Sequence, residues 1–182
     1  MRKQRLSFGQ ICNISVGMIG IQVGWGLQNA NMSAIFEKLG AEPYLLPMLW
    51  LAGPVTSVLV RPFIGWVSDH TWTRLGRRRP FLLLGSVLGS TALFFIPTSP
   101  VLWLAVVLLW METSSIHTTS EPFRPLVADK LDESQRTTGF VTQAFFIGLG
   151  ASCANAMPYL LSLTGVTGET AAGIPLTVKY SF

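Results

Sequence analysis

The sequence predicts an all-α integral membrane protein, and three observations support this: an apolar composition, long apolar segments and clustered positive charges. Of the 182 residues, 49% are hydrophobic and only 12% are charged, whereas a soluble globular domain carries roughly 25% charged residues. So few charges would not keep a soluble surface in water. The composition therefore predicts that most of the chain lies in lipid.

Five segments are long enough to cross a membrane as helices. A bilayer core about 30 Å thick needs roughly 20 helical residues, and the sequence predicts complete spans at about 11–31, 44–67, 80–96, 102–128 and 139–163. A sixth span is expected to begin near Ile174 and to be incomplete, because no complete apolar run follows Gly173. The whole chain is thus expected to form one helical transmembrane bundle.

The positive charges predict the orientation of the bundle. Lys and Arg fall mainly in three short clusters, at positions 2–5, 74–79 and 130–136, within a chain of formal net charge +4. A nucleic-acid partner is not expected, because such binding needs these residues gathered on one face. With alternating spans the three clusters share one side, which the positive-inside rule assigns to the cytoplasm. We therefore expect a multi-pass protein of the inner or plasma membrane with a cytoplasmic N-terminus.

The first predicted span carries a polar face. Gln22, Trp25, Asn29 and Ser33 are spaced three, four and four residues apart, which places them on one side of a helix. Amides offer both a donor and an acceptor to a pair of hydroxyls, and an indole packs against the apolar side of a pyranose ring. These residues are candidates for binding a sugar-like solute. Alternatively, the amides only bridge neighbouring helices.

The fourth predicted span is rich in ionisable side chains, namely Glu112, His117, Glu121 and Arg124. Such groups are costly at membrane depth, so each is a candidate for transport or proton relay. The last three are four and three residues apart, which predicts a charge-compensated ladder on one side of the helix. A structural ion-pair network is the alternative interpretation. Arg124 is expected to bind the solute, because a guanidinium can donate two parallel hydrogen bonds.

Glu112 points to another side of this helix, about one position out of phase with His117. A buried carboxyl can hold and release a proton, so Glu112, His117 and Glu121 are the candidates for proton coupling. Arg61 in the second span is interpreted as structural, reaching past Asp69 toward the cytoplasmic end of the helix.

The loop between the second and third spans carries the most specific motif. From Gly65 to Pro80 the chain reads GWVSDHTWTRLGRRRP, which resembles the loop signature of the major facilitator superfamily. This resemblance implies a cytoplasmic latch between the two halves of a transporter, although charges that only set topology are the alternative. The residues implied in this gate are Gly65, Asp69, Arg74, Gly76, Arg77, Arg78, Arg79, Asp129 and Arg136.

Further segments, at 25–31, 35–40, 66–80, 121–124 and 127–129, are similar to the sucrose and maltose proton symporter branch of that superfamily, in its bacterial form. The resemblance covers nearly the whole chain and identifies it as the N-terminal half of a major facilitator fold, with the C-terminal half absent. It implies twelve spans in the intact protein, a disaccharide or related glycoside as substrate, and symport with a proton. It implies no bound cofactor.

The chain departs from this branch at the coupling position. The resemblance implies an acidic residue at the position of Thr113, whereas this sequence has Glu112, one residue earlier and about 100° around the helix. Either Glu112 takes the coupling role, or His117 and Glu121 do. Sodium-coupled transport, facilitated transport and a non-transporting truncated fragment are the remaining alternatives. A membrane enzyme is not expected, because the sequence carries no metal-binding His pair and no nucleophile elbow.

Overall fold

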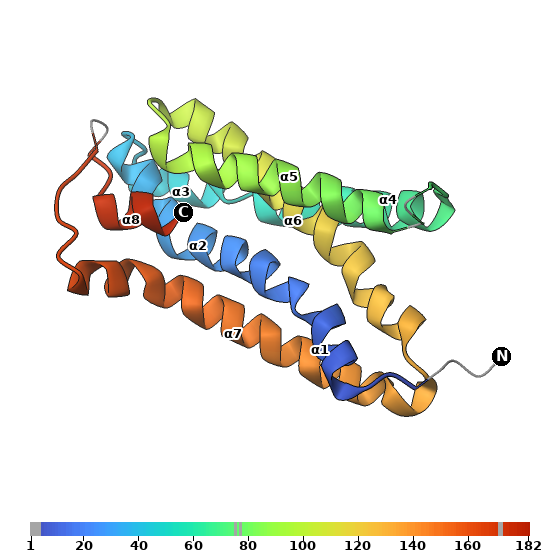
Figure 1. Cartoon of the computed structure of the whole chain (residues 1–182). Helices are drawn as coiled ribbons and strands as arrows, with labels where there is room; N and C mark the ends of the chain where they lie inside the picture. Colours follow the sequence, from blue (N-terminus) through green and yellow to red (C-terminus); the bar gives the residue numbers. More distant parts are fainter. Residues whose placement is uncertain (1–4, 75, 77, 171–172) are drawn as a thin grey trace.

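The computed structural model describes residues 5–74, 76, 78–170 and 173–182, and these residues form helices and connecting turns without a β-strand (Figure 1). The helices are α1 (Phe8–Ser15), α2 (Gly17–Lys38), α3 (Leu46–Leu49), α4 (Ala52–His70), α5 (Arg79–Phe95), α6 (Leu102–Lys130), α7 (Arg136–Leu163) and α8 (Leu176–Ser181). Short 3-10 turns lie at Pro43–Leu45 (η1), Ile96–Thr98 (η2) and Glu133–Gln135 (η3).

The segments predicted to span the membrane are helical over most of their length, and the second is interrupted by a turn at Trp50 and Leu51, between α3 and α4. The first is divided at Val16 and continues to Lys38, beyond its predicted end. Three helical stretches of the described chain are long and apolar enough to cross a membrane: Pro43–His70, Arg79–Thr98 and Glu133–Leu163. Helices α2 and α6 fall outside this group, and their sequences are the ones that carry the amides and the ionisable side chains noted above. The all-helical class is confirmed, and the number of spans stays a prediction.

The helices pack as two groups that α2 and α6 connect. Helix α6 packs against α4 and α5, while α2 packs against α7 and also contacts α6 (Figure 1). Small residues permit these close approaches. A Cβ on Gly26 of α2 would lie 2.6 Å from the Cβ of Ala154 on α7, and a Cβ on Gly85 of α5 would lie 2.8 Å from the carbonyl oxygen of Ser115 on α6.

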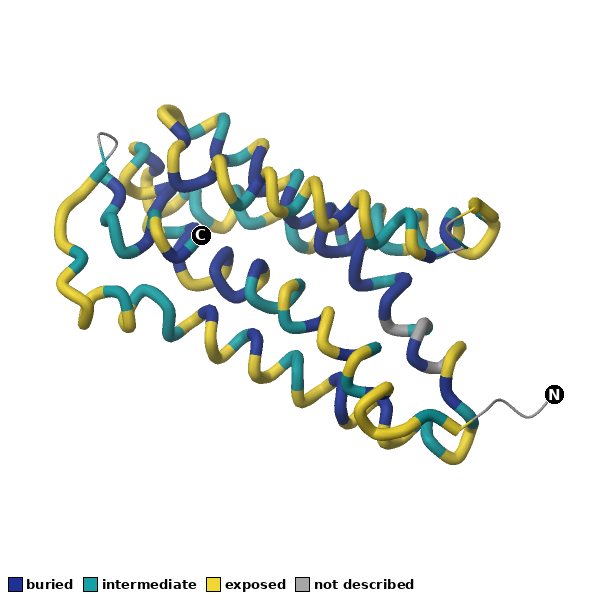
Figure 2. The backbone as a smooth tube through the Cα atoms, in the orientation of Figure 1, coloured by how far each residue is buried: buried dark blue, intermediate teal, exposed yellow. Residues whose placement is uncertain are grey.

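Burial in this bundle is inverted relative to a soluble protein. The outward surfaces of α4, α5 and α7 are apolar and exposed (Figure 2), as expected for helices that face lipid. Large exposed side chains there include Val58, Leu59, Phe63, Leu83, Val87, Phe94, Val141 and Phe145. By contrast, the middle of α6 is polar and buried, including Glu112, Thr113, Ser115, His117, Thr118, Thr119 and Ser120. The neighbouring helices therefore shield the polar helix.

The described parts of the basic clusters lie at one end of the bundle. The backbone of Leu6 exchanges two hydrogen bonds with the Gln135 side chain, at 2.9 Å and 2.7 Å. These bonds tie the start of the chain to the turn between α6 and α7. The α4–α5 turn is at the same end (Figure 1). This arrangement agrees with the alternation of spans predicted from the charges. At the other end, α8 begins near the position expected for a sixth span, and its Val178 packs in an apolar cluster with Ile96.

Candidate functional site

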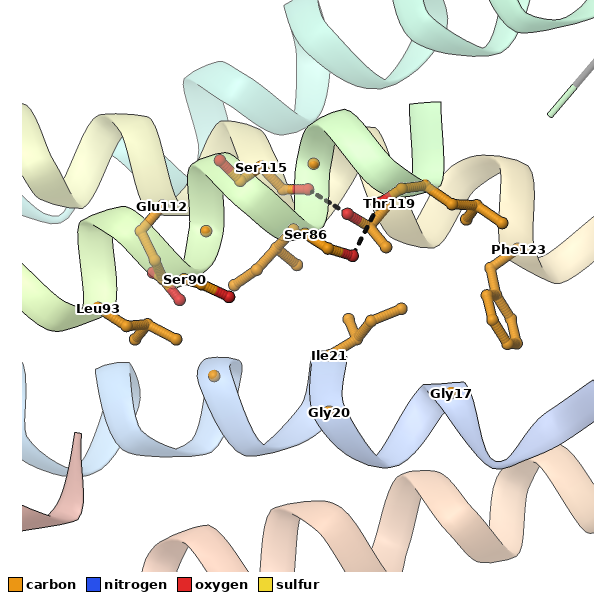
Figure 3. A pocket seen from close by; sticks show the side chains of 15 residues that line it. Gly17, Gly20, Ile21, Ser86, Ser90, Leu93, Glu112, Ser115, Thr119 and Phe123 are labelled. Atoms are coloured by element: carbon orange, nitrogen blue, oxygen red, sulfur yellow. Dashed lines mark hydrogen bonds between the residues drawn. The ribbon is translucent and has the colours of Figure 1, made fainter. Parts of the chain in front are cut away.

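A cavity of about 290 Å³ lies between α2, α5 and α6. The Glu112 side chain points into it from α6, beside Ser90 and Leu93 of α5 (Figure 3). Glu112 is fully buried, and it is the one titratable side chain among the described residues that line the cavity. A carboxyl group in such a place needs hydrogen-bond partners or a proton, because an unpaired buried charge is costly.

The cavity exists because small residues face it from all three helices. Gly17, Gly20 and Gly24 of α2 contribute no side chains, and a Cβ on Gly24 would lie 3.5 Å from a Glu112 carboxyl oxygen. Hydroxyl groups supply the polar part of the wall, from Ser86, Ser90, Ser115 and Thr119 (Figure 3). Water occupies about 30 Å³ per molecule in the liquid, so the cavity has room for several waters beside the carboxyl group.

Gln28 of α2, one turn after Gly24, also reaches the Glu112 carboxyl. Its amide lies between the Glu112 carboxyl and the Thr113 hydroxyl, and the hydroxyl oxygen is 3.1 Å from the nearer amide atom in either orientation of the amide. Gln28 is 4% exposed and Thr113 is 2% exposed. Sequence reasoning did not single out Gln28. The only available signal was its position one turn after Trp25, which does not reveal a partner on another helix.

The polar face predicted on α2 is only partly assembled. Trp25 is 40% exposed and its ring meets the ring of His117 edge-on, with centroids 6.2 Å apart. Asn29 is exposed and its amide donates to the Trp25 carbonyl oxygen at 2.7 Å. Ser33 accepts a hydrogen bond from the Trp50 indole at 3.0 Å. The structure thus places Trp25 and Asn29 on an exposed face of α2, and the buried His117 ring packs against Trp25 from α6.

Gln22 lies farther toward α7. It is half-buried, and a Cβ on Gly150 of α7 would lie 3.0 Å from its Cβ. Helix packing therefore takes part of the Gln22 side chain away from the exposed face. Arg124 is in α6, but its side chain lies outside the described residues. Its predicted place in a ladder with His117 and Glu121 stays a prediction.

Glu121 forms an ion pair across helices with Arg61 of α4. The Arg61 Nε atom donates to a Glu121 carboxylate oxygen at 2.6 Å, and a guanidinium nitrogen donates to the Ser57 hydroxyl at 3.4 Å. The expectation that Arg61 reaches past Asp69 was wrong. A carboxylate one helix away offers a closer partner for the guanidinium than the cytoplasmic end of α4 does.

The predicted gate residues converge on Arg78. Its guanidinium lies 3.2 Å from an Asp69 carboxylate oxygen at the end of α4 and 3.0 Å from an Asp129 carboxylate oxygen at the end of α6. The Arg78 side chain is only 10% exposed. Gly76 has a φ of +100°, a conformation that favours glycine and shapes the turn before α5. One arginine therefore joins the ends of three helices.

The other predicted gate residues lie around this cluster. Gly65 is in α4, one turn before Asp69. Arg74 and Arg79 are exposed, and Arg77 is outside the described residues. Arg136, at the start of α7, pairs with Glu133 at 3.6 Å. The motif thus identified the arginine-containing turn, and the structure distinguishes Arg78 as its most buried described member.

Comparison with known proteins identifies the family. The model of the MFS/sugar transport protein family matches residues 22–178. The chain is 26% identical to the general alpha-glucoside permease of Schizosaccharomyces pombe over 81% of its own length and 29% of the permease. It is 30% identical to sucrose transport protein SUC3 of Arabidopsis thaliana, over 72% of the chain and 26% of that protein.

A third relative is sucrose transport protein SUT1 of Oryza sativa subsp. japonica, 30% identical over 68% of the chain and 27% of the relative. The matched region is less than a third of the length of each of these relatives. Because this family consists of sugar transport proteins, the match confirms the prediction of a transporter rather than an enzyme. The family match spans most of the chain, including α6 and most of α2, so the chain belongs to the MFS/sugar transport protein family.

Proposed function

We propose that this chain is the N-terminal half of a secondary transporter that carries a disaccharide or related glycoside together with a proton across the inner or plasma membrane. The observation on which this rests is the fully buried Glu112 carboxyl in a partly polar cavity of a bundle with an apolar exterior. Burying an ionisable group at this depth costs free energy. Reversible protonation is a function that accounts for keeping it there.

The sugar site is proposed at the exposed face of α2 that carries Trp25 and Asn29. Trp25 offers a partly exposed indole face and Asn29 an exposed amide, which suits a ring with one apolar side and several hydroxyls. Gln22 and Arg124 complete the proposed set of substrate ligands. Relatives named as sucrose transport proteins and as an alpha-glucoside permease support a glycoside as substrate.

The cluster of Asp69, Arg78 and Asp129 is proposed to act at the cytoplasmic gate, which makes the N-terminus cytoplasmic. Its ion pairs hold α4, α5 and α6 together at one end of the bundle. Charge pairs that exist in one conformation of a transporter and not in the other bias its resting state. The missing C-terminal half is proposed to close the other side of the substrate cavity, as in transporters built from repeated halves.

Uptake by the full-length protein in liposomes tests this function. Sucrose, maltose and trehalose are offered under an imposed proton gradient and, separately, under an imposed sodium gradient. We expect accumulation of a disaccharide that the proton gradient alone drives. Accumulation driven by sodium, or equilibration without accumulation under either gradient, would contradict proton symport and favour the sodium-coupled or the facilitated alternative.

Glu112→Gln tests the coupling group. A glutamine keeps the size of the side chain but cannot release a proton. We expect loss of pH-driven accumulation with retention of substrate exchange between equal pools. If accumulation survives, Glu112 is not the coupling group.

A further inference from the structure

The buried amide of Gln28 lies between two hydrogen-bonding groups of α6, the Glu112 carboxyl and the Thr113 hydroxyl. All three side chains are almost completely shielded, at 4%, 0% and 2% exposure for Gln28, Glu112 and Thr113. An amide has a donor end and an acceptor end. An ionised carboxylate can face only the donor end of the amide, whereas a protonated carboxyl can also donate to the acceptor end.

One orientation of the amide fits a neutral Glu112. The Gln28 nitrogen donates to the Thr113 hydroxyl oxygen at 3.1 Å, and that hydroxyl donates to the Leu109 carbonyl oxygen at 2.7 Å. The Gln28 oxygen then faces the carboxyl group. Two oxygens can share a hydrogen bond only if one of them carries a proton, so the carboxyl must be the donor.

The opposite orientation fits an ionised Glu112. With the amide turned over, its nitrogen donates to the Glu112 carboxylate and its oxygen accepts from the Thr113 hydroxyl at 3.1 Å. A hydroxyl has a single proton to donate, so Thr113 then gives up its bond to the Leu109 carbonyl. The new bond to the carboxylate is charge-assisted and stronger than the bond between neutral groups that it replaces.

We propose that Gln28 is a positioning residue for proton coupling, whose amide turns over when Glu112 releases its proton to water and turns back when the proton returns. The inference rests on the proposed role of Glu112 as the coupling group. The only covalent change is cleavage or formation of the carboxyl O–H bond. Because Gln28 lies directly before Asn29 and one turn after Trp25, each turn of the amide changes the contact between α6 and the helix that carries the proposed sugar face.

No other charged side chain of the described residues takes the place of Gln28 beside Glu112. Among the described residues that line the cavity, Glu112 is the only titratable one. The charged and titratable groups on the packed helices lie at helix ends or contact other partners: Arg79 begins α5, Glu37 and Lys38 end α2, Arg136 begins α7, Arg61 pairs with Glu121, and His117 packs against Trp25.

Nuclear magnetic resonance of the full-length protein in lipid nanodiscs tests the proposal directly. Glutamine side chains are labelled with ¹⁵N, and Gln28→Met identifies the Gln28 signal. We expect the Gln28 amide signal to move with pH, at the same midpoint as the infrared band of the Glu112 carboxyl. It should stay fixed in Glu112→Met, a variant that adds no glutamine. Gln143, equally buried but on α7, is the internal control and should not follow that midpoint.

Two results would overturn the proposal: a Gln28 signal that stays fixed while the Glu112 band titrates, and a Gln28 signal that moves equally in Glu112→Met. The transport assay of Glu112→Gln separates these outcomes from failure of the proposed function. Loss of accumulation in that variant together with a fixed Gln28 signal would refute only the role of Gln28. Persistence of accumulation would refute the coupling role of Glu112 itself.

A transport profile gives a second readout. In Gln28→Met the carboxylate loses the amide donor, so the pH dependence of accumulation should move toward higher pH by about one pH unit. A Gln28 that only packs α2 against α6 would lower transport at every pH by the same factor. An unchanged pH profile in a folded Gln28→Met protein would therefore contradict the proposal.

Discussion

Replacing Glu121 by glutamine should destabilise the bundle by about 2 kcal/mol of unfolding free energy. The substitution removes the carboxylate that binds Arg61 at 2.6 Å and leaves the guanidinium without that partner. Breaking a fully buried ion pair costs about 3–5 kcal/mol, whereas an exposed pair contributes about 0–1 kcal/mol. The Arg61 and Glu121 side chains are 36% and 22% exposed, so the expected cost lies between these limits.

A double-mutant cycle measures this contribution. The full-length protein, Glu121→Gln, Arg61→Gln and the double variant are unfolded under identical detergent conditions. We expect the double variant to be more stable than the sum of the single effects predicts, by about 2 kcal/mol, because removing both partners leaves no unpaired charge. Additive effects, within about 0.5 kcal/mol, would show that the pair does not stabilise the fold.

The same variant separates Glu121 from Glu112 in transport. Glu121 is bound to a guanidinium. Glu112 instead faces the Gln28 amide and a cavity lined by glycines and hydroxyl groups. We therefore expect protein with Glu121→Gln that reaches the membrane to retain pH-driven accumulation. Loss of accumulation with normal exchange in Glu121→Gln, matched to intact accumulation in Glu112→Gln, would assign the coupling role to Glu121.

Three further predictions concern packing, substrate binding and the gate. Gly85→Ala should destabilise the bundle by about 1–3 kcal/mol, since its Cβ would lie 2.8 Å from the Ser115 carbonyl oxygen. Gly89→Ala is the control and should cost less, because its Cβ would meet only a side-chain atom, at 3.4 Å. Equal thermal stabilities of the two variants would contradict this prediction. Asn29→Ala should raise the apparent KM for sugar several-fold, and an unchanged KM would favour a helix-bridging role. Asp69→Asn should impair transport with little loss of membrane insertion. Asp69 is half-exposed, so its ion pair contributes about 1 kcal/mol or less to the stability of the fold. Normal transport per inserted molecule would indicate that the charge only sets topology.

The sequence was sufficient to predict the helices and the turn that carries Arg78. Apolar segments and the positions of the basic clusters depend on local composition, so they can be read without knowing which helices touch. That Asp69 and Asp129 lie at the same end of the bundle could also be anticipated, because both close predicted spans on the same side. What the motif left open is which of the neighbouring arginines joins them, since this depends on the turn at Gly76.

Contacts between helices could not be predicted in the same way. The partners of Arg61 and Gln28 are on α6, 60 and 85 residues away along the chain. Their meeting depends on how closely α4 and α2 approach α6, for example at Gly24 of α2, where a Cβ would lie 3.5 Å from a Glu112 carboxyl oxygen. Periodicity gives the face of a helix on which a residue lies, but it does not give the rotation and height of the adjacent helix.

Chemical labelling of the α2 face tests most directly whether these polar side chains border a hydrated route for a solute. Asn29→Cys and Trp25→Cys are made in full-length protein that lacks Cys12 and Cys153 and are exposed to a membrane-impermeant thiol reagent. Val87→Cys, on the apolar exterior of α5, is the control. We predict that both α2 positions react, that sugar slows the reaction, and that position 87 stays unreactive. Protection of both α2 positions from the reagent, with and without sugar and under either pH gradient, would contradict a transport pathway at this surface.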